Sequence, residues 1–217
     1  MTPLDGIALS IELVLISVVE AVALTFLAES AIPLMHDTSQ LMYLPYIISG
    51  LILILVFWSQ SILHAVSFIR WPLRLPHMFL YFVAAFIQVV AYSNLTDPVR
   101  WFFWMSIFSV VAVILYVIDS GVITDSRRVF MVHTHGGDFM DEVERRHRYE
   151  MRILVPIALL FNVMALSILL VLPETFSHDT PRAILGVVSA VVSLGALVDC
   201  TRNFSSRSVL IKRLLEE

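Results

Sequence analysis

The chain has 217 residues, of which 59% are hydrophobic and only 15% are charged, and its mean hydropathy is +0.86. This composition is more apolar than a soluble domain can bury in one core, so it excludes an ordinary soluble protein and indicates a membrane protein. The formal net charge of −4 is small and the acidic residues are scattered, so nothing points to nucleic-acid binding.

Six apolar stretches are long enough to cross the roughly 30 Å hydrocarbon layer as helices. The first has no basic leader region and no small-residue cleavage site, so we expect it to remain as a helix. Together the six take up most of the chain, which predicts an all-α polytopic membrane protein with six transmembrane helices. They cover residues 7–32, 43–69, 77–95, 99–120, 151–172 and 182–200.

Basic residues predict the orientation, because cytoplasmic loops collect Lys and Arg during membrane insertion. Of the 14 basic residues, only Arg100 and Arg182 fall on the outer side. With an even number of helices, this bias predicts that both termini are cytoplasmic, in a cell or inner membrane. The expected regions are four transmembrane helices in 1–120, a cytoplasmic loop and helical extension in 121–150, two further transmembrane helices in 151–200, and a cytoplasmic interfacial tail in 201–217.

The first stretch carries carboxylates inside an apolar run. Glu20 lies near its middle, where a charged carboxylate costs about 2.5–3.5 kcal/mol on insertion scales. We therefore expect Glu20 to face protein or water, either lining an ion or proton path or hydrogen-bonded to a neighbouring helix. Glu12 lies nearer an interface, and Leu24 and Leu27 form an aliphatic line that would constrict a path by dewetting. Pro33 is expected to end this helix.

The second stretch has a polar face. Gln60 and His64 are separated by four residues, which places them on one side of a helix. Trp58 to Gln60 are expected near the depth of Glu20, and His64 near the depth of Glu12, so it is geometrically possible for this face to lie opposite the carboxylates of the first helix. His64 would either tune charge along a path or pack through interhelical hydrogen bonds.

The long cytoplasmic connection contains His133-Thr134-His135 ahead of Asp138. Two histidines and a carboxylate are a legitimate ligand set, but no second cluster supplies further ligands, so we expect an exposed turn and no metal. Asp138 is expected to cap a helix that continues directly into the fifth stretch. The result would be one long helix that protrudes from the membrane into the cytoplasm.

This extension is dense in charge. Arg145, Arg146 and Arg148, together with acidic residues such as Glu144, would dock a soluble cytoplasmic protein or anionic lipid. The alternative is a solvated helix that anchors itself at the inner leaflet.

Small residues mark the sixth stretch. Gly186 and Ser189 favour close helix packing, either within the chain or between subunits. Asp119 and Asp199 fall at cytoplasmic helix ends and are expected to be hydrated. Cys200 is the single cysteine, so no internal disulfide can form, and we expect an inert buried thiol.

Helix number, orientation and two local motifs resemble the lysosomal-type potassium channels and their bacterial relatives. That family carries Phe-Ser-Asp on its first helix, and the corresponding triplet here is Val18-Val19-Glu20, which keeps only the acid. The second helix of that family has an aromatic-to-histidine stretch similar to the residues from Phe57 to His64. The resemblance covers about the first three helices and implies a channel without the usual selectivity-filter loop.

Three functions are therefore expected, in order. The first is a homo-oligomeric ion channel or pore for a monovalent cation or proton, with the first helix lining the path. The second is a membrane scaffold or effector subunit that docks a soluble cytoplasmic partner, and the third is a proton-coupled transporter. No catalytic triad, phosphate loop or cofactor motif is present in the sequence, so an enzyme is the weaker class and no cofactor is expected.

Overall fold

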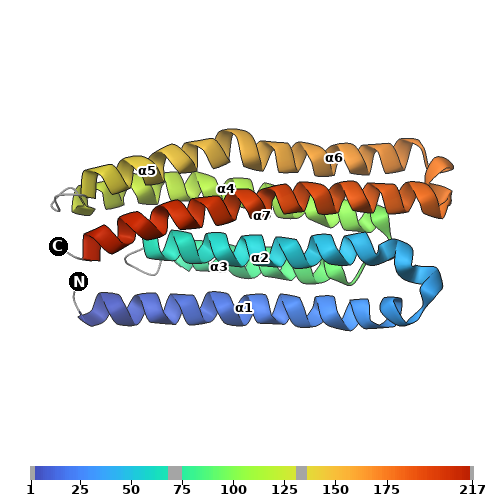
Figure 1. Cartoon of the computed structure of the whole chain (residues 1–217), viewed down its shortest axis with the longest axis horizontal. Helices are drawn as coiled ribbons and strands as arrows, with labels where there is room; N and C mark the ends of the chain where they lie inside the picture. Colours follow the sequence, from blue (N-terminus) through green and yellow to red (C-terminus); the bar gives the residue numbers. More distant parts are fainter. Residues whose placement is uncertain (1–2, 68–74, 131–135, 216–217) are drawn as a thin grey trace.

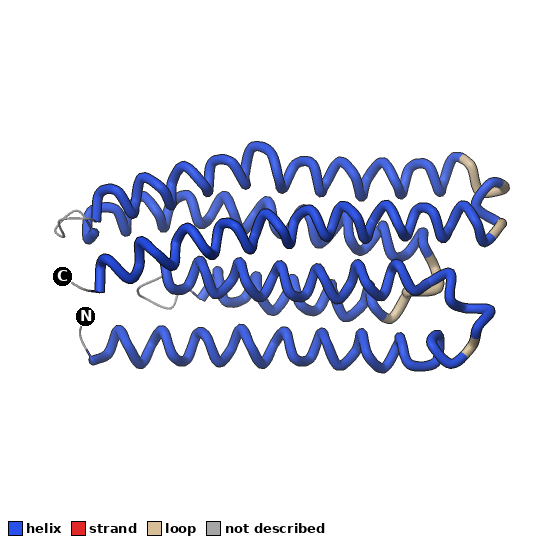
Figure 2. The backbone as a smooth tube through the Cα atoms, in the orientation of Figure 1, coloured by secondary structure: helices blue, strands red, loops and turns tan. Residues whose placement is uncertain are grey.

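The computed structural model describes residues 3–67, 75–130 and 136–215, and these residues are almost entirely helical (Figure 2). The α-helices of this described chain are α1 (Pro3–His36), α2 (Leu44–Ser67), α3 (Leu75–Tyr92), α4 (Pro98–Phe130), α5 (Gly136–Tyr149), α6 (Val155–Val171) and α7 (Asp179–Leu215). Two short 3-10 helices, η1 (Thr38–Tyr43) and η3 (Thr175–Ser177), and one π-helical turn, η2 (Glu150–Leu154), complete the order. Because the described residues form no strand, the predicted all-α class is confirmed.

The helices run side by side in one elongated bundle, with both chain ends at the same end of it (Figure 1). We call this the terminal end. α1 packs against α2 and α3, α3 against α4, and α2 most extensively against α7. α5 contacts both α4 and α7, and α6 lies along α4. Successive neighbours therefore close a ring, which leaves room for an internal cavity.

Within the described residues, five segments are long and apolar enough to cross a membrane. The apolar part of α3, Phe79–Tyr92, is shorter than these five. The described chain therefore fits a multi-pass membrane protein, and a sixth span remains a prediction. The five segments are Ser10–His36, Thr38–Ala65, Pro98–Arg127, Gly137–Val171 and Asp179–Arg207.

The outer surface of the bundle is apolar, as α1 illustrates. Ala23 and Leu27 are buried against other helices, whereas Val18 and Val22 on the opposite side are exposed. A helix that is hydrophobic on both sides suits a position between protein and lipid, because neither environment offers water.

Small residues join α2 to α7. The hydroxyl of Ser49 on α2 lies 3.0 Å from that of Ser189 and 2.9 Å from that of Ser193 on α7. One turn away, a Cβ placed on Gly186 would lie 2.7 Å from the ring of Tyr46, so the glycine permits the close approach. The small-residue face of the sixth predicted stretch is therefore used within the chain.

α1 differs from its predicted end. The helix continues past Pro33 to His36. The break comes at Asp37, whose carboxylate accepts hydrogen bonds from the backbone N–H of Ser39 at 2.9 Å and from its hydroxyl at 2.7 Å. Hydrogen bonding to the charged form lowers the pKa of Asp37 and stabilises the start of η1. The prediction that Pro33 stops the helix was wrong, because the capping residue ends it one turn later.

The terminal end is more helical than predicted. α4 extends to Phe130 and α5 begins at Gly136, so most of the region 121–150 is helix. α5, η2 and α6 follow one another without a break, which confirms that the extension runs into the fifth predicted stretch. α7 likewise continues unbroken to Leu215, so 201–217 begins as part of a membrane helix and not as a separate tail helix.

Candidate functional site

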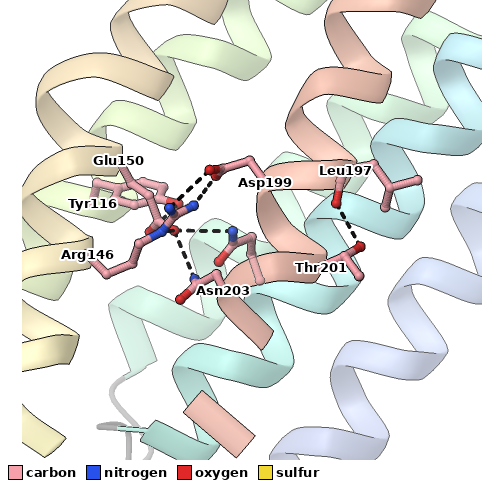
Figure 3. A network of polar contacts seen from close by, with 8 residues as sticks. Tyr116, Arg146, Glu150, Leu197, Asp199, Thr201 and Asn203 are labelled. Carbon is pink, nitrogen blue, oxygen red and sulfur yellow. Dashed lines mark hydrogen bonds and ion pairs between the residues drawn. The ribbon is translucent and has the colours of Figure 1, made fainter. Parts of the chain in front are cut away.

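A group of buried polar side chains connects α2, α4, α5, η2 and α7 towards the terminal end. Glu150 lies at its centre and is only 1% exposed. We define the polar cluster as Glu150 and the side chains that bond to it or to its arginine partner (Figure 3). Its other members are Gln60, Tyr116, Arg146, Asp199 and Asn203.

Glu150 accepts hydrogen bonds from several helices. Arg146 Nε donates to Oε1 at 2.8 Å, and Asn203 Nδ2 donates to the same oxygen at 3.2 Å. The Tyr116 hydroxyl donates to Oε2 at 3.2 Å, and Gln60 Nε2 approaches Oε1 at 3.4 Å. These donors offset part of the cost of removing the carboxylate from water.

Arg146 joins two carboxylates. Besides Glu150, its guanidinium contacts Asp199 of α7 with both terminal nitrogens, and Nη1 lies 3.1 Å from Oδ1 (Figure 3). Its side chain is 15% exposed, and the Tyr149 ring lies 4.9 Å from its Cζ. Removing one member of such a buried ion pair leaves the others uncompensated, so the three charges act as a unit.

The local sequence explains why a charge-dense helix turns this face inward. On α5, Phe139, Val143 and His147 are buried at spacings of four residues, and Glu150 continues that side. The chain then makes a π-helical turn, in which the Val155 N–H donates to the carbonyl of Glu150, five residues back. Pro156 follows directly, and a proline has no N–H for the α-helical bond and crowds the preceding turn. We attribute the wide turn to this residue.

A second buried pair lies beside the polar cluster. His64 Nδ1 on α2 is 3.0 Å from Asp119 Oδ2 on α4, and the two side chains are 6% and 1% exposed. The Tyr116 ring meets His64 edge-on at 5.6 Å and stacks on His147 at 5.4 Å. Tyr116 therefore contacts both histidines while its hydroxyl reaches Glu150, which links the pair to the polar cluster.

A cavity of about 170 Å³ opens between α2, α3, α4, α6 and α7. Ser109 and Asp119 both line it, and ten residues of one helix separate them, so the cavity extends for about 15 Å along the bundle. Near one end, Asn162 Nδ2 donates to Ser109 Oγ at 3.1 Å. The other end is lined by ionisable side chains, namely His64, Asp119, Glu150 and Asp199.

The carboxylates predicted on the first helix also face inward. Glu12 and Glu20 are both buried. Among the described residues, neither oxygen of Glu20 has a hydrogen-bond partner, and the same holds for the side-chain amide of Gln88 on α3. Trp58 Nε1 lies 3.4 Å from Ser17 Oγ.

The polar face of α2 reaches partners that the sequence did not indicate. Gln60 and His64 are directed at η2 and α4, where they contact Glu150 and Asp119. Leu24 is exposed on the outside of α1, whereas Leu27 is buried.

The charged residues of α5 divide into two sets. Arg145 pairs with Glu142 and Arg148 pairs with Glu144, both on the exposed side of the helix. Arg146 points into the bundle, where its partners are the acidic members of the polar cluster. His133 and His135 lie outside the described residues.

Several site residues were missed or misjudged from the sequence. Asp119 was expected to be hydrated, but it is buried because α4 continues well beyond it and His64 lies opposite. Asp199 was also expected in water, and it pairs with Arg146. Glu150 was not predicted as a site residue. The spacing of the residues around Val143 could have indicated it, because that spacing marks the side of the extension that faces inward.

The long apolar helices, the apolar outer surface and the buried ionisable groups together fit a helical multi-pass membrane protein. Comparisons with protein-family models, with curated proteins and with solved structures found no match. The resemblance to lysosomal-type potassium channels therefore stays a prediction.

Proposed function

We propose that this chain is a proton-coupled membrane transport protein whose path lies inside a single bundle. The observation that carries this proposal is the His64–Asp119 pair, buried at the ionisable end of the cavity. Ionisable residues within membrane segments are costly, and they commonly mark proton relays and substrate paths. Histidine suits such a role because its charge changes near physiological pH.

The groups around the pair would connect a proton to the cavity. Asp119 lines the cavity together with His64, so a change in the charge of the imidazole alters the field inside it. Tyr116 contacts His64 edge-on and its hydroxyl donates to Glu150, which links the pair to the polar cluster. A transported species and a proton would therefore bind within one set of interacting charges.

The orientation follows the positive-inside rule. Exposed arginines such as Arg127, Arg145 and Arg148 lie at the terminal end, whereas Arg100 and Arg182 are at the opposite end of the bundle. We place the terminal end, with both chain ends, on the cytoplasmic side. The ionisable end of the cavity then lies nearer the cytoplasm.

The positions of Glu12 and Glu20 favour this proposal over an oligomeric pore lined by α1. Both carboxylates are buried against helices of the same chain, and the opposite side of α1 exposes apolar residues such as Val18 and Val22. An α1-lined pore between subunits would therefore present aliphatic groups to the path.

Proton flux in proteoliposomes tests the proposal. Vesicles containing a pH-sensitive dye would be supplied in turn with alkali cations, organic ammonium ions, carboxylates and sugars. We expect one class to drive a substrate-dependent pH change, and we expect His64→Gln and Asp119→Asn to abolish it. His36→Gln, at an exposed histidine on α1, is the matched control and should behave as the wild type.

Two results would overturn the proposal. One is a folded His64→Gln variant with the proton flux of the wild type. The other is unitary current steps in planar bilayers without substrate-coupled pH change, which would indicate the predicted channel instead.

A further inference from the structure

The cavity combines an apolar body with an acidic end, and this combination defines a ligand chemistry. A dry cavity of about 150 Å³ lined by apolar side chains is large enough to hold benzene. The cavity here has a similar volume, about 170 Å³, and its apolar wall includes Leu53, Met105 and Leu115. The ligand body it suits is therefore a single ring or a short branched chain.

Aromatic rings surround the same space. Phe57, Tyr81, Phe108 and Tyr116 all line the cavity. The Phe57 ring packs against Tyr81 at 5.7 Å and against Phe108 at 5.6 Å, both with interplanar angles of 65°, so the three rings form a fixed wall. Aromatic faces attract cations, and organic ammonium ions are the ligands that aromatic cages bind.

The charged side chains that line the cavity also favour a positively charged ligand. Three carboxylates line the cavity, and His64 is the single basic residue among the described lining residues. Arg146 bonds to two of those carboxylates, Glu150 and Asp199, from outside the lining, and the buried Arg207 also interacts with Glu150, so these two carboxylates are already matched by guanidinium groups. Asp119 has the imidazole of His64 as its partner at 3.0 Å, and this partner is positive only when protonated.

We propose that the cavity binds a small organic ammonium ion, with its apolar body between the aromatic rings and its charge facing Asp119. The inference rests on the proposed function in one respect, since it names the substrate class of that site. A proton on His64 and a bound ammonium ion would each supply one positive charge beside Asp119. Binding of the ammonium ion therefore releases the imidazolium proton, which couples the two species as an exchange.

The groups that set the charge at His64 come from every neighbouring helix. α1 contributes Glu12 and α3 contributes Tyr81, and both lie within electrostatic range of Asp119. α4 contributes Asp119 and Tyr116, and α5 contributes His147. Beyond them, Glu150, Arg146 and Arg207 interact with one another in the polar cluster and beside it. The ammonium ion is expected to displace the proton from His64, because this imidazole is the basic group in the lining.

Calorimetric titration of the purified, detergent-solubilised protein tests the inference, with benzylammonium as the probe. Benzyl alcohol is the control without charge, and benzoate is the control with the opposite charge. We expect benzylammonium to bind at least tenfold more tightly than either control and Asp119→Asn to weaken it at least tenfold. Titration in buffers of different ionisation enthalpy should show net proton release when benzylammonium binds to the wild type, and none in His64→Gln.

A second variant guards against misfolding. Ala158→Phe fills the cavity from α6 without touching the ionisable end, and it should abolish binding while the melting temperature stays close to that of the wild type. Equal binding of benzylammonium and benzyl alcohol, or unchanged binding in a folded Ala158→Phe protein, would overturn the inference. Proton release unchanged in His64→Gln would also overturn it.

The two proposals fail in different ways. If benzylammonium binds as expected but moves no protons across a vesicle membrane, the cavity assignment holds and the transport proposal fails. If another substrate class drives proton flux that depends on His64 while benzylammonium does not bind, the transport proposal holds and the substrate class is wrong.

Discussion

Arg146 and Glu150 lie one helical turn apart, and the Nε of Arg146 donates to Oε1 of Glu150 at 2.8 Å inside the bundle. Arg146 belongs to a run of charged residues, and such a run is typical of a solvated helix. Its immediate neighbour Arg145 does lie in solvent, with a side chain that is 74% exposed. Adjacent arginines therefore have opposite roles, and their substitutions should have different consequences.

Replacing Arg146 by Met should be strongly destabilising. The variant leaves Glu150 and Asp199 without their shared cation, and breaking a buried ion pair costs about 3–5 kcal/mol of unfolding free energy. Arg145→Met removes only an exposed pair with Glu142, so it should cost about 0–1 kcal/mol. Equilibrium unfolding in mixed detergent micelles compares the two, and equal losses would show that Arg146 is not an internal ion-pair partner.

Replacing Glu20 by Leu should stabilise the protein. Both carboxylate oxygens are buried without a hydrogen-bond partner among the described residues, and an unsatisfied buried polar group costs about 1–3 kcal/mol. Glu29→Leu, at an exposed position of α1, is the control and should change the unfolding free energy by no more than about 0.5 kcal/mol.

The same Glu20→Leu variant tests whether the transport path runs through the His64 site alone or includes α1. Transport through the His64 site should persist in it, because the path proposed here does not use Glu20. If the substitution abolishes proton-linked flux in a folded protein, the path includes α1.

Replacing Gly186 by Ala should weaken the contact between α2 and α7. The added Cβ would lie 2.7 Å and 2.9 Å from two atoms of the Tyr46 ring, and such overpacking typically costs about 1–3 kcal/mol. Gly195→Ala on the same helix meets no atom within 4 Å and should instead gain about 0.5–1 kcal/mol from helix propensity. Thermal melts of the two variants should shift in opposite directions, and a shared direction would contradict the packing described for Gly186.

Replacing Tyr116 by Phe should have a small and specific effect. The ring still stacks on His147, but Glu150 loses a hydrogen bond of 3.2 Å, so we expect a loss of about 0.5–1.5 kcal/mol. Tyr149→Phe removes an exposed hydroxyl and keeps the ring beside Arg146, and it should leave the unfolding free energy unchanged. Chemical unfolding monitored by tryptophan fluorescence would distinguish them, and an unchanged Tyr116→Phe protein would rule out a stabilising bond to Glu150.

Most of the helical architecture could be predicted from hydropathy alone. A long apolar stretch forms a helix because unpaired backbone N–H and C=O groups are costly in lipid. The cost of exposing a carboxylate to lipid explains in the same way why Glu20 lies inward. Element ends were less predictable, because a capping residue such as Asp37 can outweigh the preceding Pro33.

The candidate site was only partly accessible from the sequence. His64 and Gln60 were identified from their spacing, but their partners lie on helices far along the chain, and no local pattern specifies which helices become neighbours. Asp119 and Glu150 both resemble hydrated residues at membrane boundaries when viewed alone. They are buried because α2, α4 and η2 lie next to one another in the fold, and the hydropathy pattern does not predict which helices become neighbours.

The serine contact between α2 and α7 has a consequence for biosynthesis. Ser49 and Ser189 are 140 residues apart in the chain, so α7, the principal neighbour of α2, is synthesised long after it. Until then the Ser49 hydroxyl and the adjoining face of α2 must be accommodated by lipid, by a temporary helix neighbour or by the insertion machinery. This contact therefore forms only once α7 has been made, and any factor that delays α7 prolongs the time during which the half-assembled chain is exposed to degradation.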